Sequence, residues 1–460
     1  MSNAALAQPK NTPFDAAAYF RDNPSKCDAT KHHLYSIDDA KKLFGDKQIY
    51  LWGGGQKGRG FYLALKRCGF SVQCFLDSSA EMIGTEFMGV PVIHPSDLLD
   101  NPEALSKAFI LAASVDSKNK QMFAVLEAKG LKKMQQYCSI QTLSPLYPTV
   151  EVTGLCNLRC SSCPRSDEEL LPPGNYMSAE NYKKVITKLV DEIPFLYLVD
   201  LYIWGEPLLN KDLPKIIEIN NSLGVASGLS TNLNNVNSLD AVLAAFPAQI
   251  RVSLSGASEE TYNITHTGGK WSRVSKNLRL LGELSRKYDN RTIVEVYFHM
   301  YRHNLHEVGE IKELCEEYGF RFHPSLAILF SDYALSYCET GFVPPSARQA
   351  EKLMLRGMSD LVSDCKKQDH LSCVLTRVAP IINWDMSVMP CCMYSYSSIA
   401  KSYLDTALSE LLYKRTYSDV CAKCQSYSLH RWNNQVFYTD YVNTHVQAHA
   451  QDALITDSVE

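Results

Sequence analysis

A regular alternation of strand-like and helix-like segments runs from Thr149 to Pro324, and it restricts the possible folds more than any other feature. Runs rich in β-branched and aromatic residues predict strands at residues 149–153, 199–203, 226–230, 250–254, 293–298 and 321–324. Amphipathic stretches between them predict helices near residues 178–191, 211–222, 238–245, 271–287 and 304–317. Alternating strands and helices form parallel sheets, so the repeats predict an α/β fold, a partial, open (β/α)6 barrel like a TIM barrel. In such barrels reactive side chains gather where the strands end.

Three cysteines follow the first predicted strand. Cys156, Cys160 and Cys163 have the spacing C-x3-C-x2-C. Thiolate sulfur is a soft ligand that suits iron–sulfur clusters and zinc. Three ligands for a four-iron cluster leave one iron without a protein donor, and chemistry can occur at that open position. A zinc site would need a fourth Cys or His close by, and none follows; three buried structural cysteines are the other alternative.

Short motifs also follow the next three predicted strands. Trp204-Gly-Glu-Pro207 comes after the second strand, Thr231-Asn232 after the third, and Ser253 lies at the end of the fourth. Together with the cysteines, these motifs resemble, in the same order, the conserved segments of the radical S-adenosylmethionine (radical SAM) superfamily. In that family the corresponding segments read Gly-Gly-Glu-Pro, Thr-Asn-Gly and Val-Ser-Leu-Asp-Gly.

The resemblance implies a cofactor and its contacts. The three cysteines would hold a [4Fe–4S] cluster whose open iron binds S-adenosylmethionine, and an electron would cleave that molecule to a 5′-deoxyadenosyl radical. Gly205 and Glu206 would contact its ammonium group. Thr231, Asn232 and Ser253 would contact its carboxylate and ribose.

The chain departs from the family pattern at three positions. Ser162 stands where relatives often have an aromatic residue, Ser255 stands where they have Asp, and His266 stands where they often have Arg. These changes concern the expected adenine and carboxylate contacts.

A second group of cysteines lies near the C-terminus. Cys373 is followed by a turn at residues 383–387, by Pro390-Cys-Cys392 and by the pair Cys421 and Cys424. This order resembles the SPASM/twitch extension, a small domain with a β-hairpin that holds an auxiliary [4Fe–4S] cluster. The dense cysteine run of a full SPASM domain is absent, so the resemblance implies one cluster. Its ligands would be Cys373, Cys391, Cys421 and Cys424. A zinc ribbon with the same four ligands is the alternative, and Cys365 and Cys392 are spare.

The N-terminal part carries a glycine motif between a predicted strand at residues 48–52 and a predicted helix at residues 61–68. The motif is Gly53-x-Gly55-x-x-Gly58, and Asp77 ends the next predicted strand, at residues 71–76. Such a loop lets a phosphate approach a helix N-terminus, and the carboxylate could bind a ribose hydroxyl. Tight packing of strand and helix would require the same glycines. With further strands expected at residues 90–93 and 108–112, the pattern predicts a Rossmann-like parallel sheet. It resembles the N-terminal domains of nucleotide-sugar-modifying acyltransferases.

The whole chain is therefore expected to form three domains, at residues 1–145, 146–330 and 331–460. A net charge of −4 argues against a nucleic-acid-binding protein. No segment reaches the ~20 apolar residues of a membrane span, and the start lacks the pattern of a signal peptide, so a cytoplasmic protein is expected. His299 and His323 end the fifth and sixth predicted strands and are candidates for proton transfer.

The predicted function is a radical SAM oxidoreductase or isomerase. It would abstract hydrogen from a substrate carbon, in the dehydrogenation or epimerisation of a nucleotide-linked sugar or a similar small molecule. A donor such as flavodoxin or ferredoxin would supply electrons. Two alternatives stay open at this point: a peptide maturase that forms thioether or carbon–carbon crosslinks, and a non-enzymatic iron–sulfur electron carrier.

Overall fold

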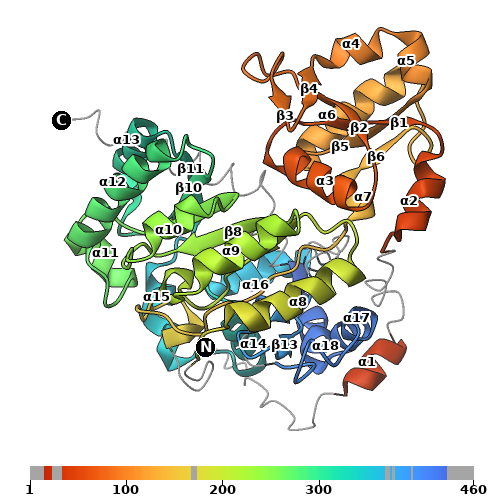
Figure 1. Ribbon diagram of the computed structural model, residues 1–460. Coiled ribbons are helices and arrows are strands. Elements are labelled where there is room, and N and C mark those ends of the chain that lie inside the picture. Colours follow the sequence, from red (N-terminus) through yellow and green to blue (C-terminus); the bar gives the residue numbers. More distant parts are fainter. Residues whose placement is uncertain are drawn as a thin grey trace.

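The computed structural model describes residues 15–22, 34–114, 116–166, 174–367, 373, 375, 379–394 and 397–431. Figure 1 shows an N-terminal α/β unit beside a larger central sheet, with a C-terminal, mainly helical unit packed against that sheet. A short helix, α1 (Ala16–Asp22), contacts the C-terminal helix α18 (Asp419–Ser426). Among the helices that the structure describes, none is long and apolar enough to cross a membrane.

The N-terminal unit is a six-stranded sheet in the order β3-β4-β2-β1-β5-β6. All neighbouring strands are parallel except the edge pair β3 and β4, which is antiparallel. Every residue of β5 is buried, as expected of a strand covered on both faces. The elements are α2 (Ile37–Phe44), β1 (Gln48–Trp52), α3 (Gln56–Arg67), β2 (Val72–Leu76), β3 (Glu86–Phe87), β4 (Val90–Ile93), α4 (Pro95–Leu99), α5 (Pro102–Ser106), β5 (Ala108–Ala112), α6 (Asp116–Ala128), β6 (Tyr137–Ser139) and α7 (Ile140–Leu143).

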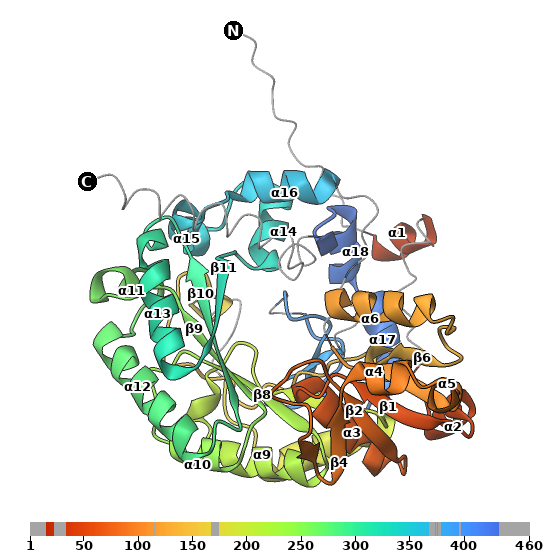
Figure 2. The ribbon, with the colours of Figure 1, turned by 90° about the horizontal axis from the view of Figure 1, so that it is seen from above.

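The central unit is a parallel five-stranded sheet in the order β11-β10-β9-β8-β7. Its helices cover the outer face of the curved sheet, as Figure 2 shows for α9, α10, α12 and α13. The elements are α8 (Ala179–Glu192), β7 (Leu198–Asp200), α9 (Leu213–Ser222), β8 (Ala226–Thr231), α10 (Leu239–Ala244), β9 (Gln249–Leu254), α11 (Glu259–Thr265), α12 (Trp271–Lys287), β10 (Ile293–Met300), α13 (Val308–Tyr318) and β11 (Arg321–Leu326).

The first predicted strand, at residues 149–153, is wrong as a full strand. Thr149 and Val150 form parallel bridges, with Asp200 on one side and Ile382 on the other, and Thr153 forms an antiparallel bridge with Tyr176, outside the central sheet. The chain leaves the sheet after Glu151, whose N–H still donates to the Ile382 carbonyl at 2.8 Å. The predicted sixth strand is also longer than expected, because β11 continues to Leu326.

The C-terminal unit extends the central sheet through a two-stranded hairpin. Strands β12 (Ile381–Ile382) and β13 (Val388–Met389) are antiparallel, and the predicted turn between them is present, with the Asn383 N–H donating to the Ser387 carbonyl at 2.8 Å. Of its helices, α14 (Ser331–Thr340), α16 (Met358–Lys367) and α18 lie across from the open side of the central sheet (Figure 2). The others are α15 (Arg348–Leu353) and α17 (Leu408–Thr416), and the Leu408 N–H donates to Glu192 of α8 at 2.9 Å.

The N-terminal unit is fastened to the central unit at the segments that precede β7 and β8. Phe61 packs on Phe195 and Tyr197 with ring centroids 6.2 and 5.7 Å away. The Arg67 guanidinium donates to backbone carbonyls in both segments, at 2.6–3.3 Å; the acceptors are Pro194, Leu196, Leu223 and Gly224. The N-terminal unit therefore contacts the central sheet at the amino ends of β7 and β8.

Candidate active site

The three cysteines of the C-x3-C-x2-C motif lie on one loop above the sheet. The backbone N–H groups of Leu158 and Arg165 point at the sulfurs of Cys156 and Cys163, both at 3.5 Å. Burial and then the neighbouring thiols Cys163 and Cys156 raise the pKa of Cys160 well above its usual value. Buried thiols that are close enough to repel one another as thiolates are a donor set that suits an iron–sulfur cluster.

A buried carboxylate that the sequence reasoning missed holds the next motif in place. Glu151 accepts hydrogen bonds from the N–H groups of Trp204 and Gly205, both at 2.9 Å. Gly205 is required there, because a Cβ would lie 1.6 Å from the Thr153 carbonyl oxygen. A charged residue between Val150 and Val152 in an otherwise apolar run was the available signal.

Glu206 joins this turn to the end of β8. Its carboxylate accepts from the N–H groups of Leu208 at 3.1 Å and Asn232 at 2.8 Å. Burial raises the pKa of Glu206 to about 7, against the effect of these donors. The Asn232 side chain donates to Asn157 at 2.9 Å and lies 3.7 Å from the Cys156 sulfur. The structure therefore brings Glu206 and Asn232 next to the cysteine loop.

The other predicted contacts line up along the same strand ends. The Thr231 hydroxyl accepts from the Leu233 N–H at 2.9 Å, and the hydroxyls of Ser230 and Ser253 are 3.5 Å apart across β8 and β9. Ser162 lies 3.1 Å from the Tyr301 hydroxyl. The roles of these residues toward a cofactor stay predictions.

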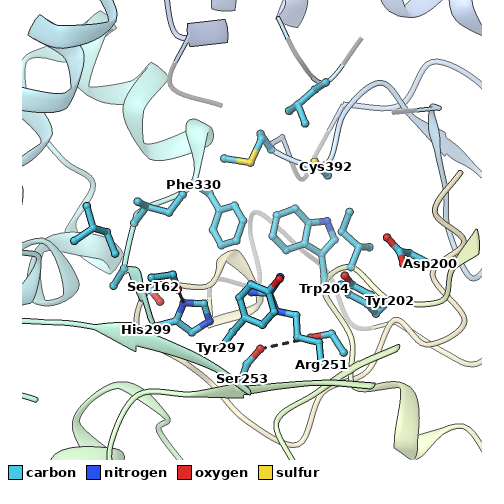
Figure 3. Close-up of a pocket in the computed structure, with 18 of the residues that line it drawn as sticks. Ser162, Asp200, Tyr202, Trp204, Arg251, Ser253, Tyr297, His299, Phe330 and Cys392 are labelled. Atoms are coloured by element: carbon cyan, nitrogen blue, oxygen red, sulfur yellow. Dashed lines mark hydrogen bonds between the residues drawn. The ribbon is translucent and has the colours of Figure 1, made fainter. Parts of the chain in front are cut away.

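A cavity of about 560 Å³ lies over the carboxyl ends of the central strands. Figure 3 shows Trp204 and Phe330 on one side of it and the polar side chains of β9 and β10 on the other. The C-terminal unit supplies part of the wall. The lining residues are Thr149, Ser162, Asp200, Tyr202, Ile203, Trp204, Ser230, Arg251, Ser253, Tyr297, His299, Tyr301, Ser325, Leu326, Ala327, Ile328, Phe330, Arg356, Leu361, Leu375, Cys392 and Met393.

The two candidate histidines lie at different depths. His299 lines the cavity, with its Nδ1 3.3 Å from the Ser325 hydroxyl. Burial, then Arg251 and His266, lower the pKa of His299 to about 3, so the ring is neutral at pH 7. His323 lies in the middle of β11, stacked on Tyr297 at 4.8 Å, and is not among the residues that line the cavity.

The four predicted auxiliary ligands lie in the C-terminal unit, close enough to act on one another electrostatically. Cys421 and Cys424 are neighbours on α18. Burial, then Cys373 and the other two thiols, raise the pKa of Cys424 well above its usual value, and burial, then Cys391 and Cys421, raise that of Cys373 to about 12. Of the spare cysteines, Cys365 is buried in the core, whereas Cys392 lines the cavity.

Arg415 lies at this second group of cysteines. It is buried, and its charge lowers the pKa values of Cys373 and Cys421 against the larger effect of burial. It also lowers the pKa of Cys391, against the hydrogen bond with Cys392 and then burial. A buried cation beside four thiols suits a donor set that carries negative charge when it holds a metal cluster. In the described part of the chain, no group of three or more His, Cys, Asp or Glu side chains is arranged to hold a metal ion.

The glycine motif of the N-terminal unit is explained in part by packing. Gly53 has a φ of +122°, and a Cβ on Gly58 would lie 1.9 Å from the Gly53 carbonyl oxygen. Gly55 is the N-cap of α3, and a Cβ there would enter open space. Asp77 accepts from the Gly54 N–H at 2.7 Å, so its carboxylate braces the loop. None of these residues lines the cavity over the central sheet.

Comparisons with known proteins agree with the site. Residues 150–315 match the family model described as the radical SAM superfamily, whose members are enzymes that use a [4Fe–4S] cluster and S-adenosylmethionine. The chain is 28% identical over 200 residues to a GTP 3′,8-cyclase of Synechocystis, covering 42% of this chain and 57% of the cyclase. It is also 28% identical over 132 residues to a 7,8-dihydro-6-hydroxymethylpterin dimethyltransferase of Methanocaldococcus jannaschii, covering 27% and 25% of the two chains.

Among solved structures, SuiB of Streptococcus suis bound to S-adenosylmethionine is similar with a TM-score of 0.41 and 12% identity, over 65% of this chain and 72% of SuiB. The cysteine loop, the Glu206 turn and the ends of β8 and β9 all lie within the matched segment. The chain therefore carries a radical SAM superfamily domain at residues 150–315.

Proposed function

We propose that this protein is a radical SAM enzyme that abstracts a hydrogen atom from a substrate carbon in the cavity over the central sheet. One observation carries the proposal: the Cys156–Cys163 loop, the buried Glu206 and the Asn232 amide lie together, and Ser162 of that loop lines a cavity large enough for a small-molecule ligand. Pockets that hold such ligands have volumes of roughly 300–1,000 Å³.

Different residues of the chain would bind the cluster, bind S-adenosylmethionine and exclude water. Cys156, Cys160 and Cys163 would hold the [4Fe–4S] cluster, which supplies the electron that cleaves bound S-adenosylmethionine to methionine and a 5′-deoxyadenosyl radical. Glu206 and Gly205 would hold the ammonium group of S-adenosylmethionine, and Thr231, Asn232 and Ser253 its carboxylate and ribose. The apolar walls, including Trp204 and Phe330, would exclude water from the radical (Figure 3).

The reaction that we propose is the dehydrogenation or epimerisation of a nucleotide-linked sugar or a similar small molecule. The four C-terminal thiols would hold an auxiliary [4Fe–4S] cluster with no open iron, which suits electron transfer better than substrate binding. Flavodoxin or ferredoxin would be the electron donor. For the N-terminal unit, Gly55 supports a nucleotide site, because the space beside it is open, whereas Gly53 and Gly58 are explained by packing.

Anaerobic reconstitution tests this function. Wild-type protein with a strong reductant should convert S-adenosylmethionine to 5′-deoxyadenosine and methionine, and it should hold about eight irons, as two [4Fe–4S] sites require. Glu206→Ala should weaken binding of S-adenosylmethionine and keep the iron. Absence of cleavage by iron-replete wild type would contradict the proposal, and stoichiometric zinc at the C-terminal cysteines would contradict the auxiliary cluster.

The nucleotide site has its own test. Calorimetry with a panel of nucleotide sugars should show binding to the full-length protein. Gly55→Val should abolish that binding and spare cleavage of S-adenosylmethionine without substrate. If no nucleotide sugar binds at millimolar concentration, the N-terminal unit has a structural role.

A further inference from the structure

Arg251 is a cation in the cavity whose charge is not matched by an ion pair within the described chain. It projects from β9 into the cavity, and no described carboxylate lies within 4.0 Å of its nitrogens. The other arginine of the cavity wall, Arg356, is paired with Asp364. Arg251 can therefore bind an anionic ligand without breaking an ion pair, whereas Arg356 would have to break its ion pair with Asp364.

The Arg251 guanidinium is held in position by neutral neighbours. It lies over the Tyr297 ring, 3.9 Å from the centroid, and its charge acts on the buried Tyr202 hydroxyl, lowering the pKa of Tyr202 against the larger effect of burial. Its Nε is buried without a partner. Stacking on an aromatic face fixes the plane of a guanidinium and leaves its N–H groups available at the edge. Figure 3 shows Arg251 and Tyr297 together at the polar side of the cavity.

The acidic side chain that lines the same cavity does not neutralise this charge. Asp200 lines the same cavity and responds electrostatically to Arg251, but the two groups are farther apart than an ion pair. Arg251 is half-buried. A charge that is partly removed from water without a partner carries a desolvation cost, and an anionic ligand offsets that cost. Planar, bidentate contacts to carboxylate and phosphate are those for which arginine is best suited.

The position of Arg251 on β9 indicates whether S-adenosylmethionine or another ligand would bind it. Arg251 and Ser253 face the same side of β9, with Arg251 about 7 Å farther from the strand's carboxyl end. The proposed contacts of S-adenosylmethionine lie at the strand ends, beside the cysteine loop. A group bound to Arg251 would lie deeper in the barrel.

We infer that Arg251 binds an anionic group of the substrate, a phosphate or a carboxylate, at the floor of the cavity. This inference rests on the proposed function, because it takes the ligand of the cavity to be the substrate of the radical reaction. The anionic end of the substrate would then point to the barrel floor, and the carbon that loses hydrogen would lie toward the cysteine loop.

The experiment uses reconstituted full-length holoenzyme loaded with S-adenosylmethionine. Methyl phosphate and acetate are titrated separately, and binding is followed by broadening of the ³¹P and ¹³C resonances of the two probes. Arg251→Met removes the charge, and Arg251→Lys keeps the charge but loses the planar fork. Arg291→Met is the matched control, because Arg291 also stacks on a ring, that of Phe246 at 3.7 Å, but is exposed at the opposite end of the adjacent strand.

We expect at least one probe to bind wild type and the Arg291 variant, and its affinity to fall about tenfold or more in Arg251→Met, with a smaller loss in Arg251→Lys. The affinity for S-adenosylmethionine should not change. Unchanged probe binding in both Arg251 variants, or no binding of either probe to wild type, would overturn the inference. Loss of S-adenosylmethionine binding in both would assign Arg251 to the cofactor instead.

Two further outcomes can be told apart: a folding defect of Arg251→Met and a failure of wild type to cleave S-adenosylmethionine. If Arg251→Met loses iron or fails to fold, the Lys variant decides, since it keeps the charge and most of the side-chain volume. If wild type binds a probe through Arg251 but never cleaves S-adenosylmethionine, the proposed function fails while the anion site stands. The probe that binds tells phosphate from carboxylate.

Discussion

At the scale of single residues, two buried carboxylates hold the backbone segments of the site together. Glu151 uses one oxygen to accept two backbone N–H groups, and Glu206 ties its own turn to the end of β8. Neither contact could be foreseen from sequence spacing, because the partners are up to 54 positions apart. The unpaired charge of Arg251 could not be predicted either, because the lack of an acidic partner is a property of the folded chain.

Glu151→Ala should destabilise the protein more than Glu151→Gln. Alanine leaves the Trp204 and Gly205 N–H groups buried without an acceptor, at a cost of about 1–3 kcal/mol each. Glutamine keeps an acceptor oxygen and removes the burial penalty that raises the pKa of Glu151 to about 7. Thermal unfolding of the anaerobic holoenzyme measures the difference. Equal melting temperatures for the two variants would show that water replaces the carboxylate.

Asp200 should make stability depend on pH. Burial raises its pKa from 3.8 to about 6, and Arg251 and the phenols of Tyr197, Tyr202 and Tyr297 are the groups that respond to it. Between these two pH values the folded state holds a proton that the unfolded state has lost, so stability falls as pH rises from about 4 to about 6. Over this pH range the free energy of unfolding falls by on the order of 3 kcal/mol.

Asp200→Asn cannot ionise and should lack this decrease. Melting temperatures of wild type and variant, measured from pH 4 to 8, should therefore diverge in favour of the variant as pH rises. Parallel curves would mean that Asp200 is solvated in the folded protein.

At the scale of elements, the sequence pattern predicted most of the parallel strands, because burial on both faces leaves runs of apolar residues. The predicted strands at residues 48–52 and 108–112 are confirmed as β1 and β5. Helix α3 starts at Gln56, earlier than predicted, because Gly58 and Gly60 lie inside it against other chain segments. Helix α2 was not predicted, although its capping box of Ser36 and Asp39 is local. The prediction of a full first central strand failed because only Thr149 and Val150 pair, with Asp200 and the distant Ile382, before the chain leaves the sheet.

The glycine motif gives a prediction at this scale. Gly58→Ala should destabilise the N-terminal unit by about 1–3 kcal/mol or more, because its Cβ would collide with the Gly53 carbonyl at the junction of β1 and α3. Gly55→Ala is the control, since its Cβ enters open space at a φ of −73°. Urea unfolding followed by circular dichroism compares the two. Equal loss in both variants would contradict the packing role of Gly58.

At the scale of the whole molecule, the N-terminal and C-terminal units attach to the central sheet in different ways. The C-terminal unit continues the sheet through the contact of Val150 with Ile382 and completes the cavity wall with Cys392 and Met393. The N-terminal unit packs on the segments before β7 and β8, and none of its described residues lines the cavity. A ligand at its glycine loop would therefore affect the cavity only through this interface or by its own length.

Arg67 should decide whether the N-terminal unit stays attached. Its guanidinium satisfies four backbone carbonyls of the central unit, and Lys cannot reach the same set from a single ammonium group. Arg67→Lys and Arg67→Ala should therefore loosen the interface in that order, while the iron content and the cleavage of S-adenosylmethionine stay at wild-type levels. Limited proteolysis should show faster cutting at residues 144–148, where Ser144 and Leu146 are buried in the intact protein. Arg273→Ala, on the exposed face of α12, is the control. Unchanged cutting in both Arg67 variants would mean that the Phe61, Phe195 and Tyr197 rings hold the two units together without the arginine.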